Sequence, residues 1–380
     1  HASGTHRVSA CLRHPPTSAQ LGEAAGVIAA RSSLDRRLPL TLAKSGYVGG
    51  IRRLLARSNH ACGTEPVDDT EDIGPDAEVT ASTVLGCCSR VNPLRPAGVS
   101  SQDRLLQFPV ATKILEEIHL YLQVLEDTHL NIRLLSGATN GSTIPGDCLE
   151  TISVPLSRGA AQWVGLPFSA KILFPGWHFI EIQGNEDILP YLCENVPVGV
   201  LSHVPTPTDR PILRNPYSRY SPVLPTLPGP GSAYCFRLSP EQPVYQPSNI
   251  VNGHSRPSRL PILWISEPTA FCYPEFLELH WPEPVGISSI DIVFDAALEY
   301  AYPAHPTSLP RKAISSIVRS YRIYAANEVG HWREVIAVDD NIYGFRSHQF
   351  DTITTKAIEI EILSTHGLSR AQVYQVRVYP

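Results

Sequence analysis

The feature that most constrains this chain is the alternation of apolar and polar side chains between residues 114 and 125. In this stretch Ile114, Ile118, Leu120, Leu122 and Val124 are apolar at even positions, whereas Glu117, His119 and Gln123 are polar at odd positions. A period of two places one face of a β-strand on a core and the other face in water. The alternation returns at residues 129–135, 162–168 and 177–184, with turn-forming residues between the segments. This pattern predicts an antiparallel β-sandwich.

A second all-β unit is predicted from about residue 233 to the end of the chain. Its expected strands are residues 276–281, 289–294, 320–325, 332–338, 357–363 and 373–379. Proline-rich residues 203–231 precede this unit and indicate a long surface connection. We therefore expect a mainly β chain with short helices near its beginning. The expected organisation is a helical part at 1–58, a linker at 59–75, a first sandwich at 76–232 and a second sandwich at 233–380.

The clearest helix is predicted over residues 18–31, where apolar side chains follow the i, i+3, i+4 spacing. Thr17 or Ser18 is placed to cap it, after two prolines that suit a helix start. Small residues make one side of this helix thin enough for very close packing: Gly22, Ala25, Gly26 and Ala29. Residues 35–58 predict one or two further helices, and the polar, acidic stretch that follows is interpreted as the linker.

Charge and composition exclude several classes of function. The formal net charge is −5 and no basic block is present, which argues against a nucleic-acid partner. No apolar run is long enough for a membrane span, so we expect a soluble protein and slightly favour the cytoplasm. The eight cysteines show no metal-ligand spacing, and we expect buried free thiols and no metal site.

The tail of the chain resembles a known module. The blocks NIVNGHSRPSRLPILWIS, EFLELHWPEPVGISSIDIVFD, SYRIYAA, HQFDTITTKAIEIEIL and YQVRVY occur in the order found in discoidin-like, galactose-binding-like domains. The resemblance covers about residues 243–380 and implies a jelly-roll β-sandwich. In many relatives the loops at one end hold a sugar or a lipid headgroup. Trp264, Phe271, Tyr273, Tyr300 and Tyr302 could stack on a sugar, although aromatic side chains more often pack a core, which is the interpretation we favour.

The beginning of the chain carries a second resemblance. HASGTHRVSACLRHPPTSAQLGEAAGVIAA is similar to the last stretch of the flavin domain in FAD-dependent oxidoreductases related to fumarate reductase. The resemblance implies that Gly22, Ala24, Ala25 and Gly26 belong to a helix that contacts FAD. It also implies that His6, Arg7 and His14 lie on the side of a small-molecule substrate as catalytic candidates. The positive end of such a helix stabilises negative charge on the reduced flavin, and small residues let the ring lie against the backbone.

The chain has no GxGxxG fingerprint to seat a dinucleotide, so it cannot hold FAD unaided. We therefore expect the C-terminal subunit or fragment of a FAD-dependent oxidoreductase, whose partner is an N-terminal flavin-domain polypeptide. The absence of methionine and a first residue inside the motif led us to expect a processed piece of something longer. The alternative is a non-enzymatic carbohydrate-binding protein, or an accessory region of a polysaccharide-degrading enzyme. The first thirty residues favour the flavoenzyme, because a carbohydrate-binding protein has no use for a thin Gly/Ala-faced helix.

Overall fold

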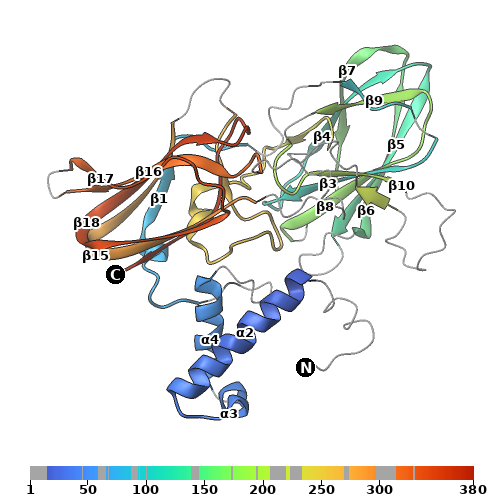
Figure 1. Cartoon of the computed structure of the whole chain (residues 1–380). Coiled ribbons are helices and arrows are strands. Elements are labelled where there is room, and N and C mark those ends of the chain that lie inside the picture. The colour runs from blue at the N-terminus through green and yellow to red at the C-terminus, as the bar shows by residue number, and fades with distance from the viewer. Residues whose placement is uncertain are drawn as a thin grey trace.

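The structure is a computed structural model of the 380-residue chain. It describes residues 15–44, 46–58, 66, 68–86, 93, 95–99, 101–137, 145–172, 174–193, 196–205, 220–222, 233–268, 274–296, 314–327 and 330–380. These residues form two β units and a group of helices that lies outside both of them (Figure 1). All the strand pairs of the described residues are antiparallel, so the prediction of a mainly β chain with antiparallel sheets is confirmed.

The helical segment (residues 15–58) contains α2 (Pro15–Leu34), α3 (Pro39–Lys44) and α4 (Tyr47–Arg57). The predicted helices are confirmed, but α2 begins at Pro15, so neither Thr17 nor Ser18 occupies the N-cap position. The reason is that proline has no backbone N–H to lose and a suitable φ, so it is tolerated within the first turn. No helix among the described residues has the length and hydropathy needed to cross a membrane.

The first β unit is a sandwich of two six-stranded sheets. One sheet has the order β11-β10-β3-β8-β5-β6, with β3 (Arg104–Val110), β5 (Thr128–Gly137), β6 (Pro145–Leu156), β8 (Gly176–Ile182), β10 (Leu201–Pro205) and β11 (Tyr220–Pro222). The other has the order β12-β9-β4-β13, with β2 on β9 and β7 on β4. Its strands are β2 (Arg95–Pro96), β4 (Glu117–Val124), β7 (Gly159–Pro167), β9 (Ile188–Cys193), β12 (Ala233–Tyr234) and β13 (Phe236–Ser239). One apolar core lies between the two sheets.

The burial of individual strands follows the sequence pattern in part. Strand β4 alternates between half-buried and buried positions along its whole length, as its period of two predicts. Strand β3 is buried at every position and β8 at all but one, although the sequence predicted alternation in residues 177–184. Both strands lie in the interior of their sheet, and their outer face carries a second small cluster of Leu105, Leu135, Trp177 and Phe179.

The C-terminal β unit consists of one seven-stranded sheet in the order β14-β19-β15-β18-β16-β17, with β1 also on β15. Its strands are β1 (Glu78–Ala81), β14 (Trp264–Ile265), β15 (Glu275–Phe294), β16 (Val318–Ala326), β17 (Trp332–Val338), β18 (Phe345–Thr365) and β19 (Gln372–Tyr379). Residues 276–281 and 289–294, predicted as two strands, are the two halves of β15, whose pairing with β18 shifts register between them. Leu279 from one half and Ile290 from the other pack in the same core, so the sheet folds over itself into two layers.

Two segments belong to a different β unit from the one that the sequence predicted. Strand β1, placed in the first sandwich by the 76–232 boundary, pairs with β15 of the C-terminal unit, with Glu78 opposite His280. Strands β12 and β13, placed in the second sandwich by the 233–380 boundary, pair with β9 and β4 of the first. Hydrophobic periodicity identifies a strand and its faces but not its partner, because the partner is chosen by long-range packing.

The expected linker also packs on the C-terminal unit. Its described residues run along the C-terminal unit, where the Ile73 N–H donates to the Val378 carbonyl at 2.9 Å. The indole of Trp281 in turn donates to the Ile73 carbonyl at 2.9 Å. The two β units are likewise in contact, since the buried Arg370 donates to the Val196 carbonyl of the first unit at 2.7 Å.

Candidate functional site

The sequence placed its candidate site on α2 and on the residues before it. His6, Arg7 and His14 lie outside the described residues. Gly22, Ala25 and Gly26 are exposed and Ala24 is half-buried on α2. A Cβ added at either glycine would meet no described atom within 4 Å. We refer to Gly22, Ala25, Gly26 and Ala29, all of which are exposed, as the open face of α2.

The opposite side of α2 holds the helical segment together. Ala24, Val27 and Ile28 pack with Tyr47 around a small buried group formed by Leu42, Ile51 and Leu55. This group is much smaller than either β core, because only three short elements contribute to it. The open face of α2 therefore points away from the packing of the helical segment itself.

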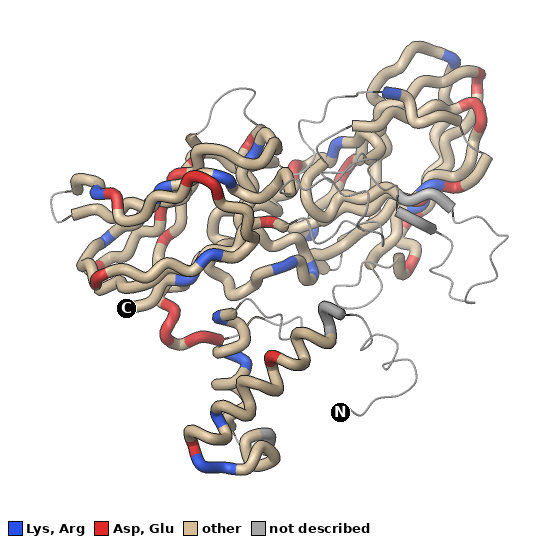
Figure 2. The backbone as a smooth tube through the Cα atoms, in the orientation of Figure 1, with Lys and Arg blue, Asp and Glu red and all other residues tan. Residues whose placement is uncertain are grey.

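Large apolar side chains also remain exposed on this segment. Six of them are Leu21, Leu34, Leu38, Leu40, Val48 and Leu54, and the exposed fraction of Leu34 reaches 77%. The segment is also basic, with seven Lys or Arg residues against Glu23 and Asp35, although the whole chain has a net charge of −5 (Figure 2). Exposed apolar side chains become evidence of an interface with another protein body when they form a large contiguous patch.

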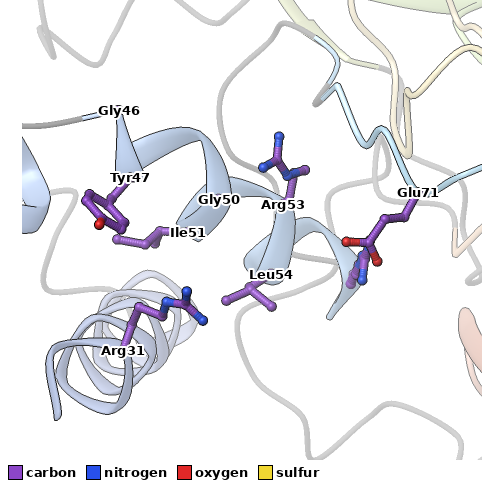
Figure 3. Close-up of a pocket in the computed structure, with 9 residues that line it drawn as sticks. Arg31, Gly46, Tyr47, Gly50, Ile51, Arg53, Leu54 and Glu71 are labelled. Atoms are coloured by element: carbon purple, nitrogen blue, oxygen red, sulfur yellow. The ribbon is translucent and has the colours of Figure 1, made fainter. Parts of the chain in front are cut away.

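A pocket of about 400 Å³ opens between α2 and α4 (Figure 3). It is lined by Arg31, Gly46, Tyr47, Gly50, Ile51, Arg53, Leu54, Arg57 and Glu71. Arg31 already pairs with Asp35, directly after the end of α2, at 2.9 Å, and Arg57 pairs with Glu71 at 2.9 Å. The pocket thus combines apolar walls with cationic groups, and part of its positive charge is neutralised within the chain.

Arg57, at the end of α4, anchors the helical segment to the rest of the chain. Its guanidinium donates to both carboxylate oxygens of Asp69 at 2.7 Å and lies over the ring of Tyr379, 4.6 Å from the centroid. Burial alone would raise the pKa of Asp69, but the hydrogen bonds and charge of Arg57 outweigh burial and hold the pKa below its usual value. Arg377 of β19 adds a second anchor by donating to the Ala56 carbonyl at 2.6 Å.

A second pocket, of about 360 Å³, lies where α4 meets the C-terminal unit. Asp72 lines it and accepts hydrogen bonds from the backbone N–H groups of Gly74 and Val378, both at 2.9 Å. Burial raises the pKa of Asp72 to about 6, and these two hydrogen bonds only partly oppose the effect. Within the described parts of the chain, no three His, Cys, Asp or Glu side chains are grouped to hold a metal ion.

The aromatic residues considered for sugar stacking divide into two groups. Phe271, Tyr273, Tyr300 and Tyr302 lie outside the described residues. Trp264 is fully buried in the C-terminal core, and its indole N–H donates to the Thr83 carbonyl at 2.9 Å. Trp264 is therefore a core residue, as the favoured interpretation held. Among the described residues of this unit, the exposed aromatics are instead Phe276 on β15, Trp332 at the start of edge strand β17, and Tyr343 in the loop that follows this strand.

The sequence did not single out the contacts that attach the helical segment. Arg57 belongs to the basic run GGIRRLLAR and Asp69 to the acidic run EPVDDTEDIGPD, and both runs are visible in the sequence. The opposite charge of the two runs was the one signal that could have predicted the contact between Arg57 and Asp69. No local sequence pattern links α4 to the acidic run.

Comparison with known proteins adds little at the level of sequence. No protein-family model matches the chain, and no curated protein matches it either. Solved structures with a similar fold include the family 32 carbohydrate-binding module of C. perfringens NanJ in complex with galactose. It has 17% sequence identity and a TM-score of 0.28, and the match covers 37% of this chain and 90% of that one.

Two further similar structures are also carbohydrate-binding modules. The family 32 module of Streptococcus pneumoniae EndoD shares 14% identity at a TM-score of 0.27, covering 35% of this chain and 83% of that one. Chitosan-binding module 1 from a chitosanase/glucanase of Paenibacillus sp. IK-5 shares 14% identity at a TM-score of 0.28, covering 36% of this chain and 86% of that one. Each of these matches covers about a third of this chain.

Proposed function

We propose that this chain is the accessory region of a larger enzyme, attached to the catalytic body of that enzyme through its helical segment. The observation that carries the proposal is the open face of α2, together with the exposed leucines elsewhere on the helical segment. A helix with so few packing partners gains little stability of its own, because most helical stability in proteins comes from tertiary contacts. A second body on this surface would remove the apolar side chains from water. The two β units brace the assembly from the other side.

For the catalytic body we propose a FAD-dependent oxidoreductase, on the resemblance carried by residues 1–30. In this proposal Gly22, Ala25 and Gly26 approach the flavin, which a separate dinucleotide-binding polypeptide or segment holds. Ala24, which the resemblance also implied as a flavin contact, packs inside the helical segment instead. His6, Arg7 and His14 face the small-molecule substrate. Small side chains on the open face of α2 support the proposal, since a flat ring needs a helix without bulky side chains. FAD when bound would supply the redox chemistry, and the helix end would stabilise negative charge on it.

The test is purification under native conditions, followed by an absorbance spectrum. A second polypeptide and the visible bands of a flavin support the proposal. Gly22→Val should then reduce the bound flavin, because it places a branched side chain on the open face. Gly49→Val is the matched control, since it puts the same side chain on an open position of α4. A colourless, folded monomer would refute the flavoenzyme proposal.

The second candidate is a carbohydrate-binding role for the C-terminal unit, alone or beside a polysaccharide-degrading enzyme. Trp332 favours it, because an exposed indole on an edge strand can stack on a sugar ring. Calorimetry with galactose and chitosan oligosaccharides tests this role in the intact chain. Binding that is lost in Trp332→Ala and kept in Phe276→Ala, another exposed aromatic, supports it. Absence of binding by the unmodified chain argues against it.

A further inference from the structure

Two buried cysteines lie beside each other in the first β unit. Cys193 ends β9, and Cys235 directly follows β12. Ala233 is opposite Cys193 in the β9–β12 ladder, and the Cys235 N–H donates to the Tyr191 carbonyl at 2.7 Å. Residues two positions apart on a strand share a face, so the two thiols meet diagonally across the ladder. Both are free thiols, and the Cys193 thiol donates to the Ala233 carbonyl at 3.5 Å.

The surroundings of the two sulfurs differ. The hydrogen bond from Cys235 lowers the pKa of Cys193 despite burial, and the nearby charge of Arg370 acts in the same direction. The same hydrogen bond, together with burial, raises the pKa of Cys235. Arg370 comes from the C-terminal unit and is held against the Val196 carbonyl at 2.7 Å. One sulfur of the pair is thus set up to lose its proton first, at the contact between the two β units.

We propose that Cys193 and Cys235 are an oxidation site, at which a small peroxide converts the two thiols into an intramolecular disulfide. The Cys193 thiolate attacks one oxygen of hydrogen peroxide and the O–O bond breaks. The sulfur becomes a sulfenic acid, and the departing hydroxide takes up a proton to form water. The sulfur of Cys235 then loses its proton and attacks the sulfur of Cys193. An S–S bond forms, the S–O bond breaks, and a second water leaves. The two thiols lose two electrons in total, and the peroxide gains them.

Access to the pair depends on a short edge strand. Cys193 and Cys235 have exposed fractions of 0% and 1%, so the oxidant reaches them when the strand opens. Strand β12 has two residues and lies at the end of its sheet, beside β9. Such an edge opens by local unfolding at a lower cost than the centre of a sheet. The reaction is therefore slower than oxidation of an exposed thiol, but it ends in a defined cross-link.

The cross-link has a structural consequence that can be measured. It would join the two ends of the proline-rich segment between Cys193 and Cys235, which restricts the unfolded chain and stabilises the first β unit. The oxidised protein should therefore unfold at a higher temperature than the reduced protein. Cys148, the third described free cysteine, is exposed on β6 of the other sheet and provides the matched control.

The test is to treat the full chain with hydrogen peroxide under native conditions, digest it without reduction and map cross-linked peptides by mass spectrometry. A peptide pair joining Cys193 to Cys235, two hydrogens lighter than the separate peptides, is expected. Cys193→Ser and Cys235→Ser should each abolish the pair and the rise in unfolding temperature, whereas Cys148→Ser should change neither. The proposal is overturned if both thiols stay reduced, if they are oxidised without cross-linking, or if they pair with other cysteines. The mapping on the unmodified chain decides this even if a variant fails to fold.

Discussion

The helical segment and the C-terminal β unit differ in how much of their apolar surface the chain itself covers. In the C-terminal unit, Trp264, Tyr321 and Ile290 are fully removed from water within one core. In the helical segment the core is limited to Leu42, Ile51 and Leu55, while apolar side chains such as Leu34 and Leu38 remain exposed. The comparison teaches that the β unit has the contacts for independent stability, whereas the helices leave much of their apolar surface uncovered by the described parts of the chain.

The two regions also differ in how they are attached. The two β units share apolar contacts, because Leu263 and Tyr374 of the C-terminal part pack into the core of the first unit. The helical segment is attached mainly by polar contacts at the end of α4, above all Arg57 with Asp69. Polar contacts at a surface contribute little free energy, so they maintain the position of the helices only weakly.

The largest expected effect is on the core of the C-terminal unit. Trp264→Ala should lower its free energy of unfolding by about 3–5 kcal/mol, because a cavity forms and the Thr83 carbonyl loses its donor. Leu34→Ala, in the exposed part of α2, should change stability by less than about 0.5 kcal/mol. Urea unfolding followed by fluorescence measures both. Similar effects for the two variants would remove the contrast between the regions.

Two buried groups, His348 within the C-terminal unit and Asp72 at its contact with the helical segment, should give pH dependences of opposite sign. Burial lowers the pKa of His348, which is hydrogen-bonded to Tyr321, to about 4. The C-terminal unit should therefore lose stability as pH falls from about 6.5 to 4, by at most about 3 kcal/mol. Asp72, with its pKa raised to about 6, behaves in the opposite way. Its contribution is present below about pH 4 and is lost as pH rises through 6, again by at most about 3 kcal/mol.

Hydrogen exchange as a function of pH separates these two effects, because the amides of Gly74 and Val378 report on Asp72 and those of β18 on His348. Asp72→Asn should flatten the first profile and leave the second unchanged, and His348→Gln should do the reverse. If each variant changed both exchange profiles alike, the assignment of one profile to Asp72 and the other to His348 would be wrong.

Removing an anchor should have a smaller effect. Arg57→Ala removes two hydrogen bonds to Asp69 and the contact with Tyr379, and should cost on the order of 1–2 kcal/mol. The loss should appear as faster hydrogen exchange in α4, with the β cores unchanged. Arg31→Ala breaks only the exposed pair with Asp35 at the end of α2 and should cost about 0.3–0.5 kcal/mol. Equal protection of α4 in the two variants would show that Arg57 is not the anchor.

The smallest expected effect concerns the open face of α2. Gly26→Ala should stabilise the helix by up to about 1 kcal/mol in the isolated chain, because alanine is the better helix former and the added methyl meets nothing. Circular dichroism during thermal unfolding measures the change. A loss of stability in the isolated chain would mean that this chain itself already covers the open face.

Local pattern was sufficient to predict the elements, but not their partners. The alternation around Leu120 and the helical spacing around Ile28 depend on neighbours in sequence, so both were predicted with the correct type. The pairing of β1 with β15 depends on contacts between residues far apart in the chain, such as Val79 with Leu279. A four-residue strand carries no signal that selects one sheet over another.

In the candidate site, too, features that depend on neighbouring residues were predicted, whereas contacts between distant residues were not. The small residues of α2 were visible in the sequence and lie on one exposed face, as a helical period requires. Trp264 was visible too, but whether a tryptophan faces a core or a ligand depends on the strand that it joins. The pairing of Arg57 with Asp69 needed the chain to turn back along β19, which no local pattern encodes.

The pairing of β1 with β15 also fixes the order in which the chain can assemble on the ribosome. Ser82 and Phe276, which exchange hydrogen bonds at the end of this pair, are 194 positions apart. At typical rates of synthesis β1 waits about 10–40 s for its partner, while most strands of the first unit emerge and can pair. The first unit is thus an insertion within the C-terminal unit, and Ile73 finds Val378 only after that residue has emerged. A ribosome that stalls before β15 emerges leaves β1 as a short strand without a sheet.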